Sequence, residues 1–415
     1  MTARARPKLI DRARLVKTAD WLAVAVASSL PWSTSGTAIL VVLWLVTFIP
    51  TLDWTNARSE LWTFAGGLPV LLVLLGALGM LWADVGLAER WDGLASFLKL
   101  LVIPLLFVQF RRSDRGACVF GGYAVACVAL LLVSFVLALW PHPIYLFSRD
   151  FGVPVKNAAS QSGEFVTCIF GFLFLTHETL LRRQWAWFAG LLTIILAMLA
   201  NIVFVATGRT ALVVMLVLLI LFAVKQLSAR GVIILFAGAL VIAAIAWASS
   251  PYLRMRTESA WIDLQTYEVN DTSNSPGERV EFAKKSMAFI RVAPIIGHGT
   301  GSIHALFEKA AAGRTGAAGS DTTNPHNQTF AVAIQLGLIG AVVLWAMWVA
   351  HVALFRGAGL AGWIGLVIVV QNIVGSLFNS HLFDFVQGWV YVFGVGVAGG
   401  MVLKRRAAKA DARVD

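Results

Sequence analysis

GACVFGGYAVACVALLLVSFVLALW, residues 116–140, contains no charged side chain and is long enough to cross a lipid bilayer as a helix. About 20 consecutive apolar residues suffice to span the roughly 30 Å hydrocarbon core of a bilayer. Comparable apolar stretches occur along most of the chain. The sequence therefore predicts a protein that crosses a membrane many times.

The composition agrees with this prediction. Of the 415 residues, 59% are hydrophobic and only 13% are charged, against about 25% charged residues in an ordinary soluble domain. The soluble, collagen, coiled-coil, disordered and disulfide-scaffold classes are excluded by this composition. The three cysteines, Cys118, Cys127 and Cys168, lie in apolar stretches. We therefore expect neither a disulfide framework nor a cysteine-based zinc site.

The apolar segments predict an all-α polytopic membrane protein with about twelve spans. The first two spans are the weakest, because Pro31 and the polar WSTSG run that follows it leave a tight hairpin. The count can therefore differ by one pair. The predicted limits are 19–33, 36–51, 62–82, 92–110, 116–140, 162–181, 184–205, 209–224, 231–249, 326–354, 358–379 and 384–403.

The distribution of positive charge orients these spans. With the N-terminus in the cytoplasm, most of the 33 Lys and Arg residues fall in short cytoplasmic loops and the two tails, as the positive-inside rule requires. The formal charge of +11 then has a topological explanation, and we expect no nucleic-acid partner. The expected organisation is a cytoplasmic tail (1–18), nine spans (19–249), an outer loop domain (250–325), three spans (326–403) and a cytoplasmic tail (404–415).

The long outer loop carries signals for two helices. Ser275-Pro276-Gly277-Glu278 has the form of a capping box with proline at the first helical position, which predicts an amphipathic helix that runs to about Arg291. The glycine-rich GHGTG of 297–301 then favours a turn, and residues 302–312 favour a second helix. Residues 313–324 have the composition of a linker and are a candidate hinge for a lid.

His326 is the first candidate for chemistry. Asn324 is a good N-cap and Pro325 a good first helical residue, so we expect His326 in the first turn of the tenth span, at the outer membrane–water boundary. The helix dipole disfavours imidazolium there, and a neutral histidine facing an aqueous cleft is suited to accept a proton. The position alone agrees equally with a histidine that only hydrogen-bonds a neighbouring loop.

Two arginines are candidates for binding an anion. Arg209 heads the eighth span after a very short outer turn, Thr207-Gly208, and an arginine held there can bind phosphate with two hydrogen bonds. Arg279 lies in the first turn of the predicted loop helix, where the dipole gives a cation no help, which favours an anionic partner. An interfacial anchor for Arg209 and a solvated helix face for Arg279 are the competing interpretations.

Further polar residues fall near the same outer face, and each has a plain structural alternative. Lys99 lies inside the fourth span, where a lysine needs an anion, an aqueous cavity or room to snorkel. Arg149 and Lys156 precede the sixth span and add positive charge there, although a solvated loop explains each of them alone. Asp384 begins the twelfth span and fits a helix N-terminal carboxylate.

The sequence contains no motif for nucleotide or metal binding. It has no Walker A sequence, no HExxH, and no Asp-x-Asp pair in an outer loop that would hold a divalent ion on a diphosphate. We therefore expect no metal site and no cofactor. The GHGTG segment has the composition of a phosphate-binding loop, but no strand precedes it, so a turn is favoured.

Three motifs, in this order along the chain, resemble those of the O-antigen ligase and polymerase superfamily. They are TGRTAL at 207–212, ERVEFAKKSMAFIRVAPIIGHGTGS at 278–302 and PHNQTFAVAIQLGLIG at 325–340. The last has the superfamily's His-Asn pair, His326-Asn327, followed after nine residues by Gly-x-x-Gly. Together with the expected topology, the resemblance covers most of the chain.

The resemblance implies a GT-C-like glycosyltransferase of the Gram-negative inner membrane, with its long loop in the periplasm. Such an enzyme moves a glycan from undecaprenyl diphosphate to lipid A-core, in contact with membrane lipids and without a cofactor. It implies that His326 is catalytic and that Arg209 and Arg279 act on the diphosphate. The additional substrate-binding candidates are Lys99, Arg149, Lys156, Asn327 and Asp384.

Alternatives remain inside and outside this superfamily. An O-antigen polymerase and a protein O-oligosaccharyltransferase share these motifs. The basic C-terminal tail favours the ligase over the protein transferase, whose relatives often carry a further outer domain. A transporter of lipid-linked glycans also has about twelve spans, but we find no internal hydropathy repeat, and most spans lack an ionisable residue at their centre.

Overall fold

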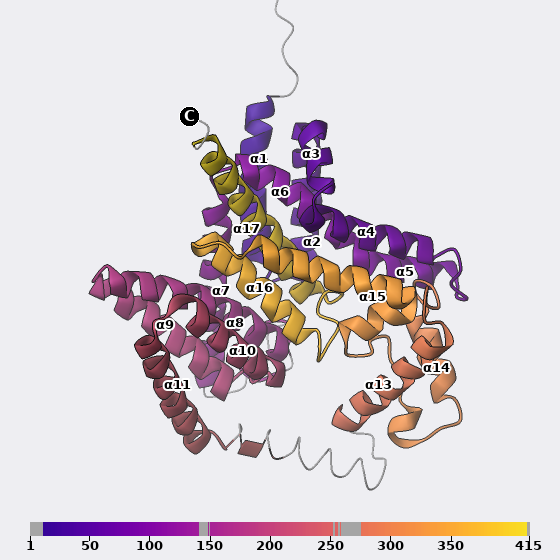
Figure 1. The fold of residues 1–415 in the computed structure, drawn as a ribbon. Coiled ribbons are helices and arrows are strands. Elements are labelled where there is room, and N and C mark those ends of the chain that lie inside the picture. Colours follow the sequence, from indigo (N-terminus) through magenta and orange to yellow (C-terminus); the bar gives the residue numbers. More distant parts are fainter. Residues whose placement is uncertain are drawn as a thin grey trace, which may run out of the picture.

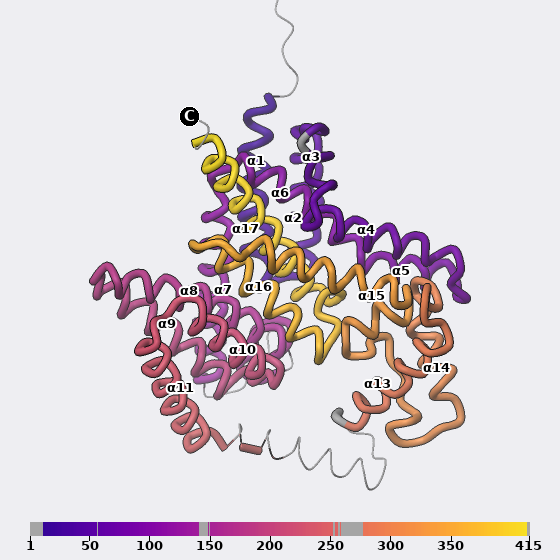
Figure 2. Tube along the Cα trace, in the orientation of Figure 1, coloured from indigo at the N-terminus to yellow at the C-terminus, as the bar shows by residue number. Residues whose placement is uncertain are grey.

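The computed structural model describes residues 11–140, 148, 150–251, 254, 255, 258 and 275–412. These residues form helices and connecting turns, and no strand occurs among them (Figures 1 and 2). The prediction of an all-α membrane protein is therefore confirmed. The α-helices are α1 (Arg12–Ser29), α2 (Thr34–Phe48), α3 (Trp54–Leu61), α4 (Phe64–Gly79), α5 (Leu87–Leu98), α6 (Val102–Arg112), α7 (Gly116–Leu139), α8 (Ala158–Leu181), α9 (Trp185–Phe204), α10 (Arg209–Gln226), α11 (Ala229–Ser249), α13 (Ser275–Val292), α14 (Ile303–Ala311), α15 (Gln328–Leu354), α16 (Leu360–Gly375) and α17 (Phe385–Asp411).

Each of the twelve predicted spans coincides with helix, but the number of crossings is not fixed by this agreement. In the described part of the chain, nine helical segments are long and apolar enough to cross a membrane, and α4 and α16 are shorter apolar helices. The fourth predicted span is not one straight helix. A 3-10 turn at Lys99–Leu101 joins α5 to α6.

Two apolar clusters hold the bundle together. The first lies where α17 packs along α6 and where α15 packs along α4, with Trp44, Phe107, Trp348 and Tyr391 fully buried in it. The second lies where α8 contacts α9, α10 and α16. Helix α11 has no buried residue and lies at the edge of the molecule in Figure 1. Its apolar side chains are therefore free to face lipid.

The two predicted loop helices are present. Helix α13 ends at Val292, one residue beyond the expected end, and α14 occupies Ile303–Ala311. Both pack against α15 through a small apolar cluster that includes Phe282, Phe307 and Ile334. The two loop helices thus pack on the N-terminal part of α15, around Ala331 and Ile334; Figure 1 shows α13 and α14 beside this helix.

A break inside α15 receives the glycine-rich turn. Gly337 has φ 63° and ψ −160°, which interrupts the helix, and the carbonyl groups before the break are released from helical hydrogen bonding. They accept hydrogen bonds from the turn: His298 N donates to Ile334 O at 2.8 Å, and Gly299 N donates to Gln335 O at 2.9 Å. The GHGTG segment is therefore a structural turn, as predicted.

Replacing Gly337 with alanine is expected to lower the melting temperature clearly. The combination of positive φ and extended ψ at Gly337 is nearly confined to glycine and costs another residue about 1–3 kcal/mol, and a Cβ at this position would also overlap the backbone of Ile295 and Ile296. Gly190→Ala is the matched control, because Gly190 is helical and a Cβ there meets no atom within 4 Å. Tryptophan fluorescence during heating measures both variants. Equal melting temperatures would show that the break at Gly337 is not required.

Candidate functional site

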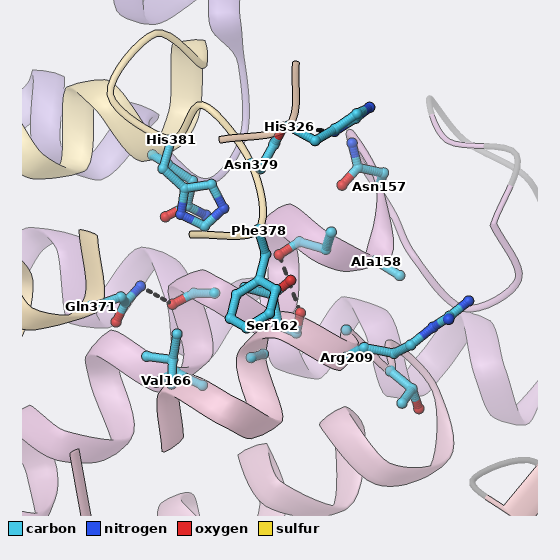
Figure 3. Close-up of a pocket in the computed structure, with 18 of the residues that line it drawn as sticks. Asn157, Ala158, Ser162, Val166, Arg209, His326, Gln371, Phe378, Asn379 and His381 are labelled. Carbon is cyan, nitrogen blue, oxygen red and sulfur yellow. Dashed lines mark hydrogen bonds between the residues drawn. The ribbon is translucent and has the colours of Figure 1, made fainter. Parts of the chain in front are cut away.

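A cavity of about 370 Å³ opens between the two packed groups of helices and α13. Its walls come from the start of α8, the start of α10, helix α13, the turn before α15, and the connection between α16 and α17. Figure 3 shows Ser162, Arg209, His326 and Asn379 around it. The polar and charged side chains that line it are Asp150, Asn157, Ser162, Thr207, Arg209, Thr210, Arg279, His326, Gln371, Asn379, His381 and Gln387. The three predicted catalytic residues therefore share one cavity.

Arg209 is positioned by a tight turn between α9 and α10. The Thr207 hydroxyl donates to Ile202 O at 2.8 Å and closes the end of α9. Gly208 packs directly against Ser162 of α8, where a side chain would not fit. Helix α10 then begins at Arg209 with no side-chain cap on its first N–H groups. The exposed guanidinium of Arg209 thus lies beside the free N–H groups of a helix N-terminus. Both attract negative charge, so this position favours binding of an anion.

Arg279 approaches the same cavity from α13. Burial lowers its pKa, and the positive charge of Arg209 lowers it further. The two guanidinium groups are therefore close enough to interact electrostatically. Among the described residues, no carboxylate lies within salt-bridge distance of either one. Two unneutralised cations facing one cavity favour a multiply charged anion there.

His326 does not lie in the first turn of a helix, so that prediction is wrong. Helix α15 begins two residues later, at Gln328, and its N-cap is Asn327, whose Oδ1 accepts from Phe330 N at 3.1 Å. Asn324 instead forms a turn in which its Oδ1 accepts from His326 N at 2.9 Å. His326 itself has φ 54°. The backbone turn therefore sets the direction of the imidazole.

A chain of hydrogen bonds fixes which nitrogen of His326 is available. His326 Nδ1 lies 3.1 Å from Asn379 Oδ1. That oxygen also accepts from Asn324 Nδ2 at 2.7 Å, and Asn379 Nδ2 donates to Asp384 Oδ2 at 2.7 Å. Rotating the Asn379 amide would place its nitrogen against Asn324 Nδ2 and its oxygen against Asp384 Oδ2. Neither pair could form a hydrogen bond, so the oxygen of Asn379 must face His326. Nδ1 then carries the hydrogen, and Nε2 is left as the proton acceptor.

The surroundings of His326 favour its neutral form. Burial lowers its pKa below 6.5, and the positive charge of Arg279 acts in the same direction. The hydrogen bond with Asn379 and the charge of Glu278 oppose these effects. The ring of Phe282, one turn after Arg279 on α13, stacks over the imidazole at a centroid distance of 6.0 Å. Helix α13 thus supplies both a cation and an apolar cover to the histidine.

Four of the five predicted substrate-binding residues, Lys99, Lys156, Asn327 and Asp384, do not line the cavity. Lys99 is buried and donates to the carbonyl groups of Phe383 and Asp384 at 2.9 Å each. Lys156 points inward, to buried Glu164 at 3.3 Å and to Leu30 O. These lysines therefore support the scaffold around the cavity.

Three further predicted residues have other outcomes. Asp384 stands at the N-cap position of α17 but makes no side-chain cap, and it reaches the site only through Asn379. Asn327 caps α15. Arg149 lies outside the described residues.

Sequence reasoning did not identify Asn379, His381, Gln371 or Gln387. A usable signal was the polar run Asn379-Ser380-His381 between two apolar segments. Asn379 and Ser380 both form hydrogen bonds with Asn324. Asn379 Oδ1 accepts from Asn324 Nδ2 at 2.7 Å, and Ser380 Oγ donates to Asn324 Oδ1 at 2.7 Å. The connection between α16 and α17 is thus tied to the turn that presents His326.

A comparison with known protein families found a match within this chain. Residues 193–346 match the model of a family described as O-antigen ligase. The matched interval contains Arg209, Arg279 and His326, together with the whole of α10 and α13. No curated protein matched the chain.

Proposed function

We propose that this protein, whose residues 193–346 match a family described as O-antigen ligase, belongs to that family and is itself an O-antigen ligase. It transfers a glycan from undecaprenyl diphosphate to lipid A-core. Members of the family are glycosyltransferase-like membrane enzymes that act on lipid-linked glycans. The observation that carries the proposal is a single cavity that combines a neutral, oriented histidine with two arginines and an uncapped helix N-terminus.

The proposed reaction is a single inverting displacement. His326 Nε2 takes the proton from an acceptor sugar hydroxyl as the hydroxyl oxygen forms a bond to the anomeric carbon of the donor. The bond between that carbon and the diphosphate oxygen breaks, and its electron pair leaves with undecaprenyl diphosphate. Arg209, Arg279 and the first N–H groups of α10 stabilise the charge that develops on the leaving group. The donor is already activated, so no nucleotide takes part.

The proposed location is the inner membrane of a Gram-negative bacterium, with the cavity on the periplasmic side. The concentration of Lys and Arg in the N-terminal and C-terminal tails supports cytoplasmic ends. Gln387, at the start of α17, lines the cavity, whereas the basic C-terminal tail lies at the opposite end of that helix. Undecaprenyl diphosphate would then present its headgroup at the level of Arg209 while its chain stays in lipid.

A transfer assay with the purified protein tests the proposal. The native chain is incubated in EDTA with undecaprenyl-diphosphate glycan and lipid A-core, and we expect glycan joined to lipid A-core. Longer glycans that remain on undecaprenyl diphosphate would identify a polymerase instead. Transfer to an added protein acceptor would identify a protein O-oligosaccharyltransferase. Movement of the donor across the bilayer without a new glycosidic bond would refute the enzyme assignment.

The rate of transfer is expected to hold as the pH falls through 6.5 and to decline only below it. A general base must be neutral, and the pKa of His326 is lowered by burial and by Arg279. Arg279→Gln removes a positive charge, so the pKa rises and the acid limb of the kcat/KM profile moves to higher pH. Arg291→Gln, on the same helix but outside the cavity, is the control. If the acid limb of the kcat/KM profile stays at the same pH in Arg279→Gln, that limb does not report the titration of His326.

A further inference from the structure

One end of the cavity is polar but carries no charge. Gln371 of α16, His381 of the α16–α17 connection and Gln387 of α17 line it. Figure 3 shows His381 and Gln371 on one side of the cavity and Arg209 on the other. The cations that line the cavity are Arg209 and Arg279. Charge is therefore concentrated on one side of the site, and neutral hydrogen-bonding groups on the other.

Gln387 is the most informative of these residues. Its side chain is only 9% exposed, and it packs against Gly163 of α8, where any side chain would displace its amide nitrogen. Within the described parts of the chain, no residue forms a hydrogen bond with this amide. Gln387 lines the cavity, and a primary amide both donates and accepts hydrogen bonds, so this amide is available to a polar occupant of the cavity.

His381 and Gln371 add hydrogen-bonding groups of the same kind. His381 lines the same end of the cavity. Its Nδ1 is buried against Gly375 without a hydrogen-bond partner among the described residues, so an occupant of the cavity contacts the rest of the ring. Burial lowers the pKa of His381 to about 4, so the ring is neutral near pH 7. Gln371 Nε2 donates to Gly163 O at 2.8 Å, and its Oε1 accepts from Thr167 at 2.9 Å. One amide hydrogen of Gln371 is left for an occupant.

We propose that Gln371, His381 and Gln387 form a subsite that binds a sugar ring of the lipid-linked glycan, next to the diphosphate held by the arginines. The proposal rests on the proposed function, because it assigns a place to the glycan of the same donor. Sugar hydroxyl groups both donate and accept, and so do primary amides and a neutral imidazole. A phosphate group would be held better by the guanidinium groups, and a prenyl chain would leave all three side chains without partners.

Binding measurements on the full-length protein in nanodiscs test the subsite. The probes are undecaprenyl diphosphate and the undecaprenyl-diphosphate-linked glycan extracted from the source organism. The variants are Gln387→Leu and His381→Phe, which keep side-chain volume and remove polar atoms. Thr193→Val is the control, because the Thr193 hydroxyl is on an exposed part of α9 and bonds only to Ala189 O. Melting temperatures verify that each variant is folded.

We expect the native protein to bind the glycan-bearing lipid more tightly than the sugar-free lipid. Each subsite variant should raise the Kd of the glycan-bearing lipid by about threefold to tenfold, as expected for one lost hydrogen bond. The Kd of the sugar-free lipid should not change. Equal weakening of both lipids, or no change for either, would overturn the subsite. A native protein that does not prefer the glycan-bearing lipid would overturn it as well.

This experiment separates the subsite from the proposed function. If the native protein shows the preference and the variants lose it, but no glycan is transferred to any acceptor, the subsite stands and the transferase assignment fails. If transfer occurs and the variants keep the full preference, the transferase assignment stands and the subsite fails. Gln371 is left unchanged in the test because its bonds to Gly163 and Thr167 also join α16 to α8.

Discussion

Replacing His326 with alanine is expected to lower the rate of glycan transfer by about 10²–10⁴-fold, the usual contribution of a general base. The physical reason is that Nε2 of this imidazole is the nitrogen left free once Nδ1 is bonded to Asn379. His326→Gln keeps a polar group at the site but provides no base at neutral pH, so it should be equally inactive. The measurement is the initial rate with saturating donor and acceptor.

The control for this substitution is another histidine of the same loop region. His304 lies exposed on α14, where its Nε2 is 3.7 Å from a carboxylate oxygen of Asp321, and it does not line the cavity. His304→Ala should keep nearly the native rate. Because Phe282 stacks on His326, the melting temperature of His326→Ala must be compared with that of the native protein. A folded His326→Ala protein with native activity would remove this residue from the mechanism.

The same argument makes Asn379 a positioning residue. Asn379→Ala leaves Nδ1 of His326 without its acceptor, so the imidazole loses both its tautomer preference and its fixed orientation. We expect a smaller loss of rate than in His326→Ala and an acid limb at lower pH, since the hydrogen bond with Asn379 raises the pKa of His326. Asp384 acts on His326 only indirectly, because it accepts a hydrogen bond from the amide of Asn379.

The fold was largely predictable because its signals are local in sequence. Runs of apolar residues predict membrane helices, and Ser275-Pro276-Gly277-Glu278 predicts the start of α13, which is where the structure has it. The start of α15 was predicted wrongly because Asn324 and Asn327 are both good N-caps. The structure uses Asn327, since the side chain of Asn324 is occupied by His326 N, Asn379 and Ser380. That occupation depends on residues more than 50 positions away in sequence.

The candidate site was predictable only in part, for the same reason. Arg209, Arg279 and His326 stand next to recognisable turns and helix starts, and the structure gathers them around one cavity. Lys156 has an equally suggestive position in the sequence, but its ammonium group turns away to Glu164 inside α8. A single sequence does not show such a pairing, because the direction of a long side chain depends on which buried group lies within its reach.

Replacing Arg209 or Arg279 with alanine is expected to lower the transfer rate by about 10²–10³-fold, the typical cost of removing one group that stabilises developing charge. Both guanidinium groups face one cavity, and each lacks a carboxylate partner among the described residues. Lysine variants should recover only part of the rate, because an ammonium group does not reproduce two parallel hydrogen bonds to a phosphate. Because the two arginines interact, the double variant should lose less than the product of the single losses.

Inhibition by sugar-free undecaprenyl diphosphate distinguishes this role from simple anchoring of anionic lipids. If the arginines hold the leaving group, each alanine variant should raise the inhibition constant of this product, whatever the surrounding lipid. If they only anchor the protein, the inhibition constant should stay at its native value in neutral lipid, and only stability in anionic lipid should change. Arg291→Ala on α13 is the control, since this arginine is exposed and does not line the cavity. The anchoring outcome would leave His326 without a charge-stabilising partner and would refute the displacement proposed for this site.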